Sequence, residues 1–315
     1  MRGGRRTIGV AVVGFGWMGR VHARAYSRLP HHFPDLPAVP KLVAVAEDVP
    51  GRADEGAEQF GFDTAANDWR DLLTDARVDA VSVTVPNFLH RDVGVALARA
   101  GKHIWIEKPV GLGPDDARAV AEAVATAGVR CAVGFNYRHA PAVAAAHDLI
   151  AAGQIGAVTH ARFRLLGDYA AHPEGALTWR YERARGGDGV LGDLASHGVD
   201  LVRFLLGDIA SLVADTAIVI PERPRPDGAA VGHARASGGS MGPVENEDHV
   251  SALLRLVSGA RVMLEASRVA VGAQNSYGFD IHGTRGALSW DFRRMGELGI
   301  STGTAYQDQP VTTVH

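Results

Sequence analysis

The sequence predicts an α/β N-terminal domain with a doubly wound parallel sheet, followed by an α+β C-terminal domain with an open, mainly antiparallel sheet. Near-continuous apolar runs alternate with helix-like segments in the first half, which is typical of parallel strands covered on both faces. In the second half, strand-like runs follow one another through mostly short connections, which favours antiparallel pairing. The 315 residues suffice for two domains, which we place at residues 1–138 and 139–315.

The apolar runs of the first domain predict five strands, at residues 7–13, 41–47, 79–85, 103–107 and 129–135. Helices are expected between them, at residues 17–29, 51–60, 90–100 and 114–128. Residues 29–41 contain four prolines in thirteen residues. Because proline cannot continue a helix, this segment is expected to be an inserted loop.

The second domain has six strand candidates, at residues 158–167, 211–220, 248–257, 260–269, 277–283 and 286–292. One helix is expected from about Leu191 to Leu206. Residues 221–245 are rich in proline and glycine and have no periodicity, so we expect a long loop there.

The composition excludes several kinds of partner. A formal net charge of −3 gives no electrostatic reason to expect nucleic acid or a membrane surface. The single cysteine, Cys131, excludes an internal disulfide and a thiolate-rich metal site, and its apolar neighbours predict a buried position. A signal peptide is the alternative for the basic, then apolar N-terminus. Charged or polar residues at Arg20, His22 and Arg24 argue against it, so we expect a cytoplasmic protein.

A glycine-rich turn follows the first predicted strand. Gly14, Gly16 and Gly19 have the spacing G-x-G-x-x-G, which serves dinucleotide binding when a strand precedes it and a helix follows. Gly14 allows the tight turn, Gly16 lets a pyrophosphate approach the backbone, and Gly19 permits close packing of helix and strand. The intervening residues expected at the cofactor are Phe15, Trp17 and Met18.

The acidic residue that should hold the ribose hydroxyls is displaced by the proline-rich insertion. The second strand ends on Glu47 and Asp48, where this acid belongs. A solvated acidic loop is the alternative. Two acids would repel the 2′-phosphate of NADP, so NAD is favoured over NADP.

Two further stretches follow parallel strands, at the sheet edge that lines a cofactor crevice. Pro86, Asn87 and His90 lie in TVPNFLH, which could contact ribose or nicotinamide, or simply form a turn. Glu107 and Lys108 lie in IEKPVG. The glutamate could accept a bond from a ribose hydroxyl and the lysine could favour a substrate alkoxide, with a surface ion pair as the alternative.

A third stretch, GGDGVLGDLASHGVDLVRFLLG, places Asp193, His197 and Asp200 on one face of a helix. Histidine is suited to take a proton near neutral pH, and a carboxylate one turn away can orient it. The alternatives are a metal site, for which no second ligand cluster is evident, and a structural polar cap.

These motifs together resemble the glucose–fructose oxidoreductase / inositol dehydrogenase (Gfo/Idh/MocA) family. The resemblance covers nearly the whole chain, and the EKP and D-x-x-x-H-x-x-D stretches are its most specific parts. The proline-rich insertion, FNYRHAPAV, LTWRYE and IPERP are most similar to levoglucosan dehydrogenase-type members. The sequence departs from the family pattern at Val85, where a threonine is common, and it lacks the C-terminal helix that relatives carry after the sheet.

The resemblance implies a Rossmann domain and an open sheet used for assembly into a homodimer or homotetramer. It implies that Lys108, Asp193 and His197 are catalytic. It also implies that Asn136 lies near the nicotinamide and that Trp179 and Arg180 belong to a loop that closes over cofactor and substrate. Tyr137 and Tyr169 are candidate substrate contacts, and no metal is expected.

The function expected from these residues is NAD(P)-dependent oxidation of a ring secondary alcohol in a sugar, anhydrosugar or cyclitol. His197 would remove the hydroxyl proton, Lys108 would stabilise the alkoxide and Asp193 would tune His197. Two alternatives remain open. One is a redox-assisted glycosidase or lyase that returns the hydride, and the other is a cofactor-binding sensor without turnover.

Overall fold

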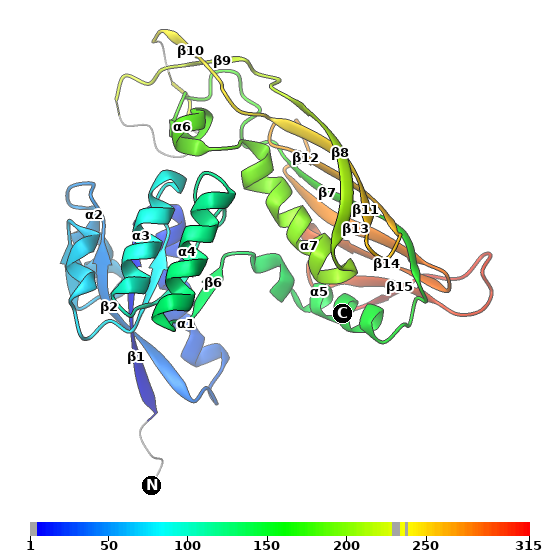
Figure 1. Ribbon diagram of the computed structural model, residues 1–315, viewed down its shortest axis with the longest axis horizontal. Coiled ribbons are helices and arrows are strands. Elements are labelled where there is room, and N and C mark those ends of the chain that lie inside the picture. The colour runs from blue at the N-terminus through cyan, green and yellow to red at the C-terminus, as the bar shows by residue number, and fades with distance from the viewer. Residues whose placement is uncertain (1–4, 229–233, 237–238) are drawn as a thin grey trace. The chain divides into compact units, whose positions relative to one another are not determined.

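The computed structural model describes residues 5–228, 234–236 and 239–315, and the chain divides into two compact units, Met1–Gly134 and Phe135–His315 (Figure 1). Residues 1–4 of the basic N-terminus, and residues 229–233 and 237–238 of the expected long loop, lie outside the described residues. Each unit has its own sheet and its own buried apolar core.

The first unit contains a six-stranded sheet in which every pairing is parallel. The strand order is β3-β2-β1-β4-β5-β6, which is the doubly wound order of nucleotide-binding domains. Its strands are β1 (Arg6–Val13), β2 (Ala38–Ala46), β3 (Thr64–Ala66), β4 (Ala80–Val83), β5 (His103–Ile106) and β6 (Cys131–Val133).

Helices cover both faces of this sheet, with α1 packed against α2 and α3 against α4 (Figure 1). The helices are α1 (Trp17–His32), α2 (Arg52–Phe60), η1 (Trp69–Leu73), α3 (Asn87–Arg99) and α4 (Pro114–Ala127). Because each parallel strand feeds a helix at its carboxyl end, the loops with the predicted motifs gather at one edge of the sheet.

The proline-rich insertion forms less loop than the sequence predicts. Helix α1 continues through Pro30 to His32, and strand β2 begins at Ala38, so only residues 33–37 lie between them. Pro40 is tolerated within β2 because β3 pairs only with Ala44–Ala46, which leaves one side of β2 without a hydrogen-bonding neighbour at Pro40.

The prediction that Cys131 is buried is wrong, because its side chain is exposed. Strand β6 is the last strand of the sheet, and it pairs only with β5. An edge strand has a neighbour on one side only, so an apolar sequence there does not guarantee burial.

The second unit contains an eight-stranded mixed sheet and a small two-stranded sheet. All pairings in the large sheet are antiparallel except the parallel pair β7–β12. Its strands, in the order in which they lie, are β16 (Thr312–Val314), β15 (Leu298–Thr302), β14 (Gly286–Asp291), β13 (Asn275–Gly283), β7 (Val158–Gly167), β12 (Arg261–Ser267), β11 (His249–Leu256) and β8 (Ile209–Ala217).

The sequence prediction missed several elements of this unit. The expected long loop contains β9 (Glu222–Pro224) and β10 (Met241–Pro243), which pair antiparallel. Helix α5 (Pro141–Ala151) was also not predicted. The remaining helical elements are η2 (Asn136–His139), η3 (Trp179–Tyr181), α6 (Arg183–Gly186), η4 (Leu191–Ala195), α7 (Ser196–Leu206) and η5 (Phe292–Arg294).

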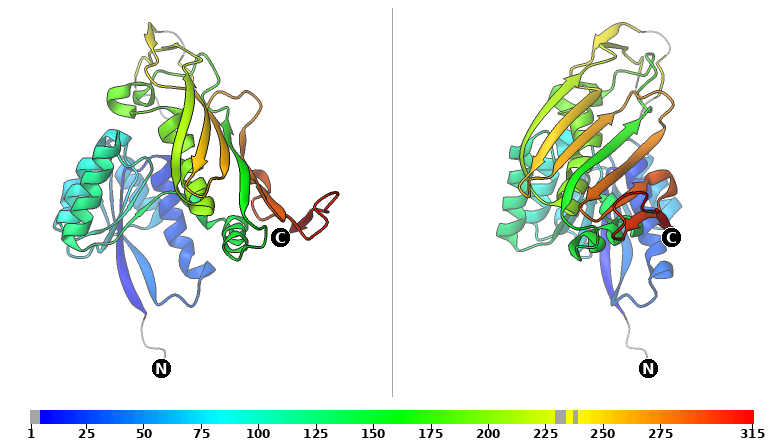
Figure 2. Two further views of the ribbon diagram at one scale, coloured as in Figure 1. Left: turned by 45° about the vertical axis from the view of Figure 1, so that its right-hand side comes forward. Right: turned by 90° about the vertical axis from the view of Figure 1, so that its right-hand side faces the viewer.

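Helices α5 and α7 pack against one face of the large sheet, and the other face is open. Burial alternates along β11 and β12, as expected for strands with one covered and one exposed face. The open face is turned toward the viewer in the right-hand view of Figure 2. Close contact of α7 with the sheet depends on Gly198, because a Cβ there would collide with the side chains of Leu165 and Leu264.

Candidate functional site

The glycine-rich turn joins β1 to α1, and the surroundings of its three glycines differ. Gly14 has a φ of +84°, and a Cβ there would lie 2.9 Å from the carbonyl carbon and oxygen of Thr84. At Gly19 a Cβ would collide with the carbonyl oxygen of Gly14. Apart from its chain neighbours, no atom lies within 4 Å of a Cβ built at Gly16, which caps α1. This free space at a helix N-terminus fits a dinucleotide phosphate.

Thr84 stabilises the turn from the neighbouring strand. Its hydroxyl lies 2.5 Å from the carbonyl oxygen of Gly14 and 3.0 Å from that of Val13. The backbone N–H of Thr84 also donates to Val13, at 2.8 Å. Val85 replaces the threonine that is common in the family. The hydroxyl of Thr84, one position earlier, contacts the turn instead.

The two acids at the end of β2 have different surroundings. Glu47 is buried, and its Oε2 accepts a hydrogen bond from the backbone N–H of Phe15 at 2.6 Å. Its Oε1 accepts from the N–H of Val49 at 3.1 Å, and Arg52 lies 3.6 Å away. Asp48 is exposed. Glu47 thus fixes the glycine-rich turn from the position where a ribose-binding acid belongs.

Glu107 belongs to a buried network that the sequence analysis did not predict. His22 Nε2 lies 3.0 Å from Glu107 Oε1, and His22 Nδ1 lies 3.0 Å from the hydroxyl of Ser82. The hydroxyl of Tyr26 is 2.8 Å from the same serine oxygen, and burial raises the pKa of Tyr26. A Cβ at Gly134 would lie 2.6 Å from the Glu107 carboxylate. The polar residues His22 and Tyr26 on an otherwise apolar helix face were the available signal.

His90 connects the two loops that follow β4 and β5. Its Nε2 lies 2.8 Å from the carbonyl oxygen of Val85, and its Nδ1 lies 2.7 Å from that of Pro109. The ring is 1 % exposed, and this burial lowers the pKa of His90 despite the two carbonyl contacts. A neutral imidazole carries one N–H, so the ring donates to one of these carbonyl oxygens and packs against the other. This arrangement fits a positioning role, and the expected cofactor contact stays a prediction.

Lys108 and Asn87 lie at the same sheet edge as the glycine-rich turn, because β4 and β5 are neighbours. Both side chains are half-buried, and Asn87 begins α3 directly after Pro86. The N–H of Glu107 donates to Val83 at 3.0 Å, which holds the start of the EKP stretch beside β4. The first unit thus collects the predicted residues that follow β1, β2, β4 and β5.

The second unit carries Asp193 in the π-helical turn η4 and His197 in the first turn of α7. The hydroxyl of Tyr169 donates a hydrogen bond to Asp193 Oδ2. His197 is buried, with its ring centroid 4.6 Å from that of Tyr137 and 5.6 Å from that of Phe135. An imidazole and a carboxylate one turn apart are therefore enclosed by aromatic rings.

Asp200 has a different partner from the other two polar residues of this helix. Its carboxylate receives two hydrogen bonds from the guanidinium of Arg138, at 2.6 and 2.5 Å. The ion pair ties α7 to η2, which also carries Tyr137 and the exposed Asn136. Asp200 is thus placed in a structural pair.

Trp179 and Arg180 lie in η3, where the Arg180 guanidinium carbon is 4.4 Å from the Trp179 ring centroid. Burial lowers the pKa of Arg180. The next residue, Tyr181, has the guanidinium carbons of Arg223 and Arg268 within 4.4 and 4.7 Å of its ring centroid. These cation–π contacts fix the segment that precedes α6.

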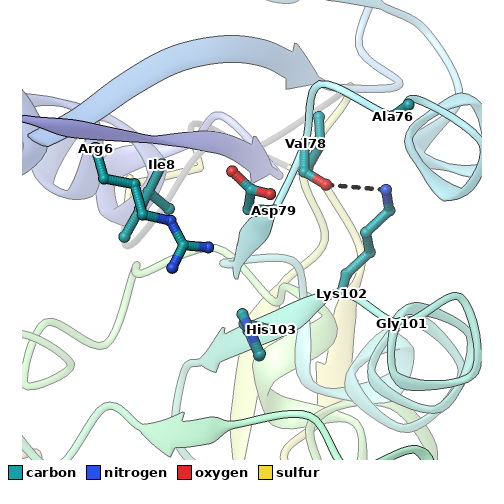
Figure 3. A pocket seen from close by; sticks show the side chains of 8 residues that line it. All are labelled: Arg6, Ile8, Ala76, Val78, Asp79, Gly101, Lys102 and His103. Carbon is teal, nitrogen blue, oxygen red and sulfur yellow. Dashed lines mark hydrogen bonds between the residues drawn. The ribbon is translucent and has the colours of Figure 1, made fainter. Parts of the chain in front are cut away.

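A cavity of about 380 Å³ lies at the opposite edge of the first sheet, at the amino ends of β1 and β5 (Figure 3). Lys102 donates there to the carbonyl oxygens of Asp75 and Val78, at 2.7 and 2.9 Å. None of the predicted site residues lines this cavity. Within the ranges that the structure describes, no group of three His, Cys, Asp or Glu side chains could hold a metal ion, and no helix could cross a membrane.

Comparison with known proteins agrees with this arrangement. Residues 8–135 match the family model for oxidoreductases with an NAD-binding Rossmann fold, and residues 143–289 match the GFO/IDH/MocA C-terminal domain. The chain belongs to the Gfo/Idh/MocA family. The predicted family and fold class are confirmed, and this Gfo/Idh/MocA protein is an oxidoreductase of an NAD-binding family.

Relatives of this Gfo/Idh/MocA protein include two named dehydrogenases. It is 37% identical over 306 residues to levoglucosan dehydrogenase of Pseudarthrobacter phenanthrenivorans, covering 96% of this chain and 78% of the relative. It is 29% identical over 309 residues to inositol 2-dehydrogenase of Rhizobium meliloti, covering 97% and 82%. A levoglucosan dehydrogenase structure in complex with NADH and levoglucosan matches with a TM-score of 0.91 and 35% identity, over 98% of this chain and 80% of that one.

Proposed function

We propose that this protein oxidises a ring secondary alcohol of a sugar, anhydrosugar or cyclitol, with NAD as the hydride acceptor. The observation that carries the proposal is the buried imidazole of His197, one helical turn from the Asp193 carboxylate to which Tyr169 donates. A histidine with a nearby oriented carboxylate is suited to general-base catalysis. The named relatives act on levoglucosan and inositol, which favours a polyhydroxylated ring as substrate.

We assign the proton-transfer roles to three residues. His197 takes the proton of the substrate hydroxyl, and Asp193 stabilises the imidazolium that forms. Lys108 donates a hydrogen bond to the same oxygen and stabilises the alkoxide. NAD, when bound, supplies the acceptor for the hydride.

In this proposal, the first unit provides most of the cofactor contacts, and the second unit provides the others and binds the substrate. The phosphates are held by the turn from Gly14 to Gly19 and the N-terminus of α1, as the free space at Gly16 suggests. Glu47 accepts from the ribose and disfavours a 2′-phosphate, so NAD is preferred over NADP. The remaining proposed cofactor contacts are Asp48, Pro86, Asn87, Glu107, Asn136, Trp179 and Arg180, and Tyr137 is a proposed substrate contact.

The open sheet face supports the proposal that two or four copies assemble through it. Its central row holds Val213, Leu253 and Met263, each at least half exposed. Charged residues flank this row on both sides. Arg255, Arg261, His160 and His282 lie on one side, and Asp215, Glu265 and Arg164 lie on the other. In a two-fold assembly the apolar row of each copy would be covered by its partner, and Met263→Asp should lower the mass measured by light scattering.

To test the proposed function, the protein is mixed with NAD or NADP and with levoglucosan, inositols or common aldoses near neutral pH. Turnover is measured by the absorbance of the reduced cofactor. We expect reduced NAD with at least one of them, and a loss of about a hundredfold or more in kcat for His197→Ala. Exposed His32 provides the matched control, since His32→Ala should keep full activity. Product without net NAD reduction would support a redox-assisted glycosidase or lyase, and cofactor binding without any turnover would support a sensor.

A further inference from the structure

We propose that Tyr169 is a positioning residue: its hydroxyl holds the Asp193 carboxylate and takes up part of its charge, which keeps His197 in the neutral form that can accept a proton. The inference rests on the proposed function, and it assigns Tyr169 a role different from the substrate contact expected from the sequence. Four structural observations support it.

The first observation is the hydrogen bond itself. Tyr169 donates to Asp193 Oδ2 from 24 residues away in the chain. A hydrogen bond from a neutral donor to a carboxylate is charge-assisted, and is roughly twice as strong as one between neutral groups. Such a bond stabilises the ionised carboxylate and spreads its charge.

The second observation is how firmly the segment around Tyr169 is held. The N–H of Ala170 donates to the carbonyl of Arg268 at 3.0 Å, and the carbonyl of Ala170 accepts from Arg223 at 2.5 Å. Arg223 also donates to the carbonyl of His172 at 2.9 Å. Since Arg223 is fully buried, the phenol approaches Asp193 from a fixed backbone rather than a mobile loop.

The third observation is the absence of a side chain at Gly167. A Cβ there would lie 3.1 Å from Cδ1 and 3.2 Å from Cε1 of the Tyr169 ring. These distances are tighter than normal carbon contacts, so a larger residue at this position would press on the ring. Gly167 therefore provides the space in which the Tyr169 ring lies.

The fourth observation is electrostatic. Burial, and after it the charge of Asp193, raise the pKa of Tyr169 well above its ordinary value. The phenol therefore stays protonated and can act toward Asp193 only as a donor. The phenols of Tyr137 and Tyr277 also stay protonated, because burial, and in addition the charge of Asp193, raise their pKa values. The same carboxylate acts on the charge of Arg180.

Tyr277 provides a matched control for Tyr169. It is a buried tyrosine that feels the charge of Asp193, with a pKa of about 12, but its hydroxyl donates to Asn275 Oδ1 at 3.1 Å. Tyr277→Phe therefore removes a phenol from the same surroundings without removing the bond to Asp193. Tyr169→Phe removes that bond and leaves the ring in place.

The experiment is an NMR titration of the His197 Cε1–H signal between pH 5 and 9 in the full chain, assigned by its loss in His197→Gln. Without the phenol, the Asp193 charge acts more strongly on the imidazolium, so Tyr169→Phe should raise the titration midpoint by about half a pH unit or more. Tyr277→Phe should move it by less than about 0.2 units. An unchanged or lowered midpoint in Tyr169→Phe would overturn the inference, whether or not the protein turns over a sugar.

Kinetics separate this role from substrate binding and from a merely structural role. Once a substrate has been found, Tyr169→Phe should move the acid limb of kcat/KM to higher pH and leave the Kd for NADH unchanged. An increase in KM alone, with the pH profile fixed, would instead identify a substrate contact. In an Asp193→Asn background, Tyr169→Phe should cause no further shift of the pH profile, because the two residues act through one hydrogen bond.

A wild type that reduces no NAD with any sugar would contradict the proposed function, while the NMR result would still decide the role of Tyr169.

Discussion

The carboxylate of Glu47 accepts a hydrogen bond from the backbone N–H of Phe15 at 2.6 Å, across 32 residues of sequence. This bond connects the end of β2 to the glycine-rich turn after β1. The acid is thus a structural partner of the turn as well as a candidate for ribose. The two roles can be separated by substitution.

Glu47→Gln should weaken NAD binding by roughly tenfold or more, because it removes the charge that holds the Phe15 N–H and is proposed to accept from the ribose. NADP should lose less affinity than NAD, because the charge that repels its 2′-phosphate is also removed. Isothermal titration calorimetry with both nucleotides measures the two changes. Exposed Glu58 is the control, and an equal loss in Glu58→Gln would show that the buried bond is not the cause.

Gly14 and Gly16 should respond differently to alanine. Gly14→Ala forces a Cβ onto a backbone with φ of +84°, against the carbonyl of Thr84, and should cost about 1–2 kcal/mol or more of unfolding free energy. Gly16→Ala meets no protein atom and should stay within about 0.5 kcal/mol of the wild type, while its NADH affinity falls. Urea unfolding and NADH fluorescence titration check the two expectations. An unaltered NADH affinity in Gly16→Ala would place the phosphates elsewhere.

His90→Ala should destabilise the first unit and lower activity. The neutral ring donates to one of the carbonyls of Val85 and Pro109, and leaving that carbonyl without its donor should cost about 1–3 kcal/mol. The loop with Lys108 would also lose its connection to the loop with Val85. Thermal unfolding and kcat at a temperature well below the transition measure these effects. If kcat is unchanged although stability falls, His90 does not position Lys108.

Asp291 should contribute to stability in a pH-dependent way. Hydrogen bonds from Arg293 lower the pKa of this carboxyl to about 2, and Arg164 adds a further bond at 3.2 Å. Because the folded pKa is below the unfolded value of about 3.9, the stabilisation is complete above about pH 4 and is lost as the pH falls toward 2. Asp291→Asn should therefore be less stable than the wild type by about 1 kcal/mol at pH 7, with the difference vanishing near pH 2. Urea unfolding at pH 7, 4 and 3 measures it, with exposed Asp35→Asn as the control.

The sequence predicted the first unit well, because buried parallel strands appear as apolar runs and the glycine spacing fixes the turn after β1. It predicts too much loop at residues 29–41, because proline usually ends a helix and is rarely found within a paired strand. Pro30 lies in the last turn of α1, where its missing N–H costs the helix one hydrogen bond near its end. Pro40 occupies a part of β2 with one unpaired side, where no hydrogen-bond donor is required. Such edges depend on which strands become neighbours, and local sequence does not specify this.

The sequence predicts where the candidate site residues lie more completely than it predicts which residues they contact. Asp193 and His197 lie one turn apart as expected, yet the bond from Tyr169 to Asp193 joins segments 24 residues apart. The pair of Arg138 with Asp200, and the contact of His22 with Glu107, span 62 and 85 residues. Partners at such separations follow from the fold, and no spacing rule along the chain points to them.

The exposure of Cys131 on edge strand β6 makes the chain convenient for site-specific labelling. It is the only thiol in the sequence and lies three positions before the last residue of the first unit, Gly134. Partial burial raises the pKa of the thiol, so maleimide coupling should be slow at neutral pH and faster in alkaline buffer. A single fluorophore or spin label there would report how the edge strand β6 of the first unit responds to nucleotide, without any cysteine having to be removed first.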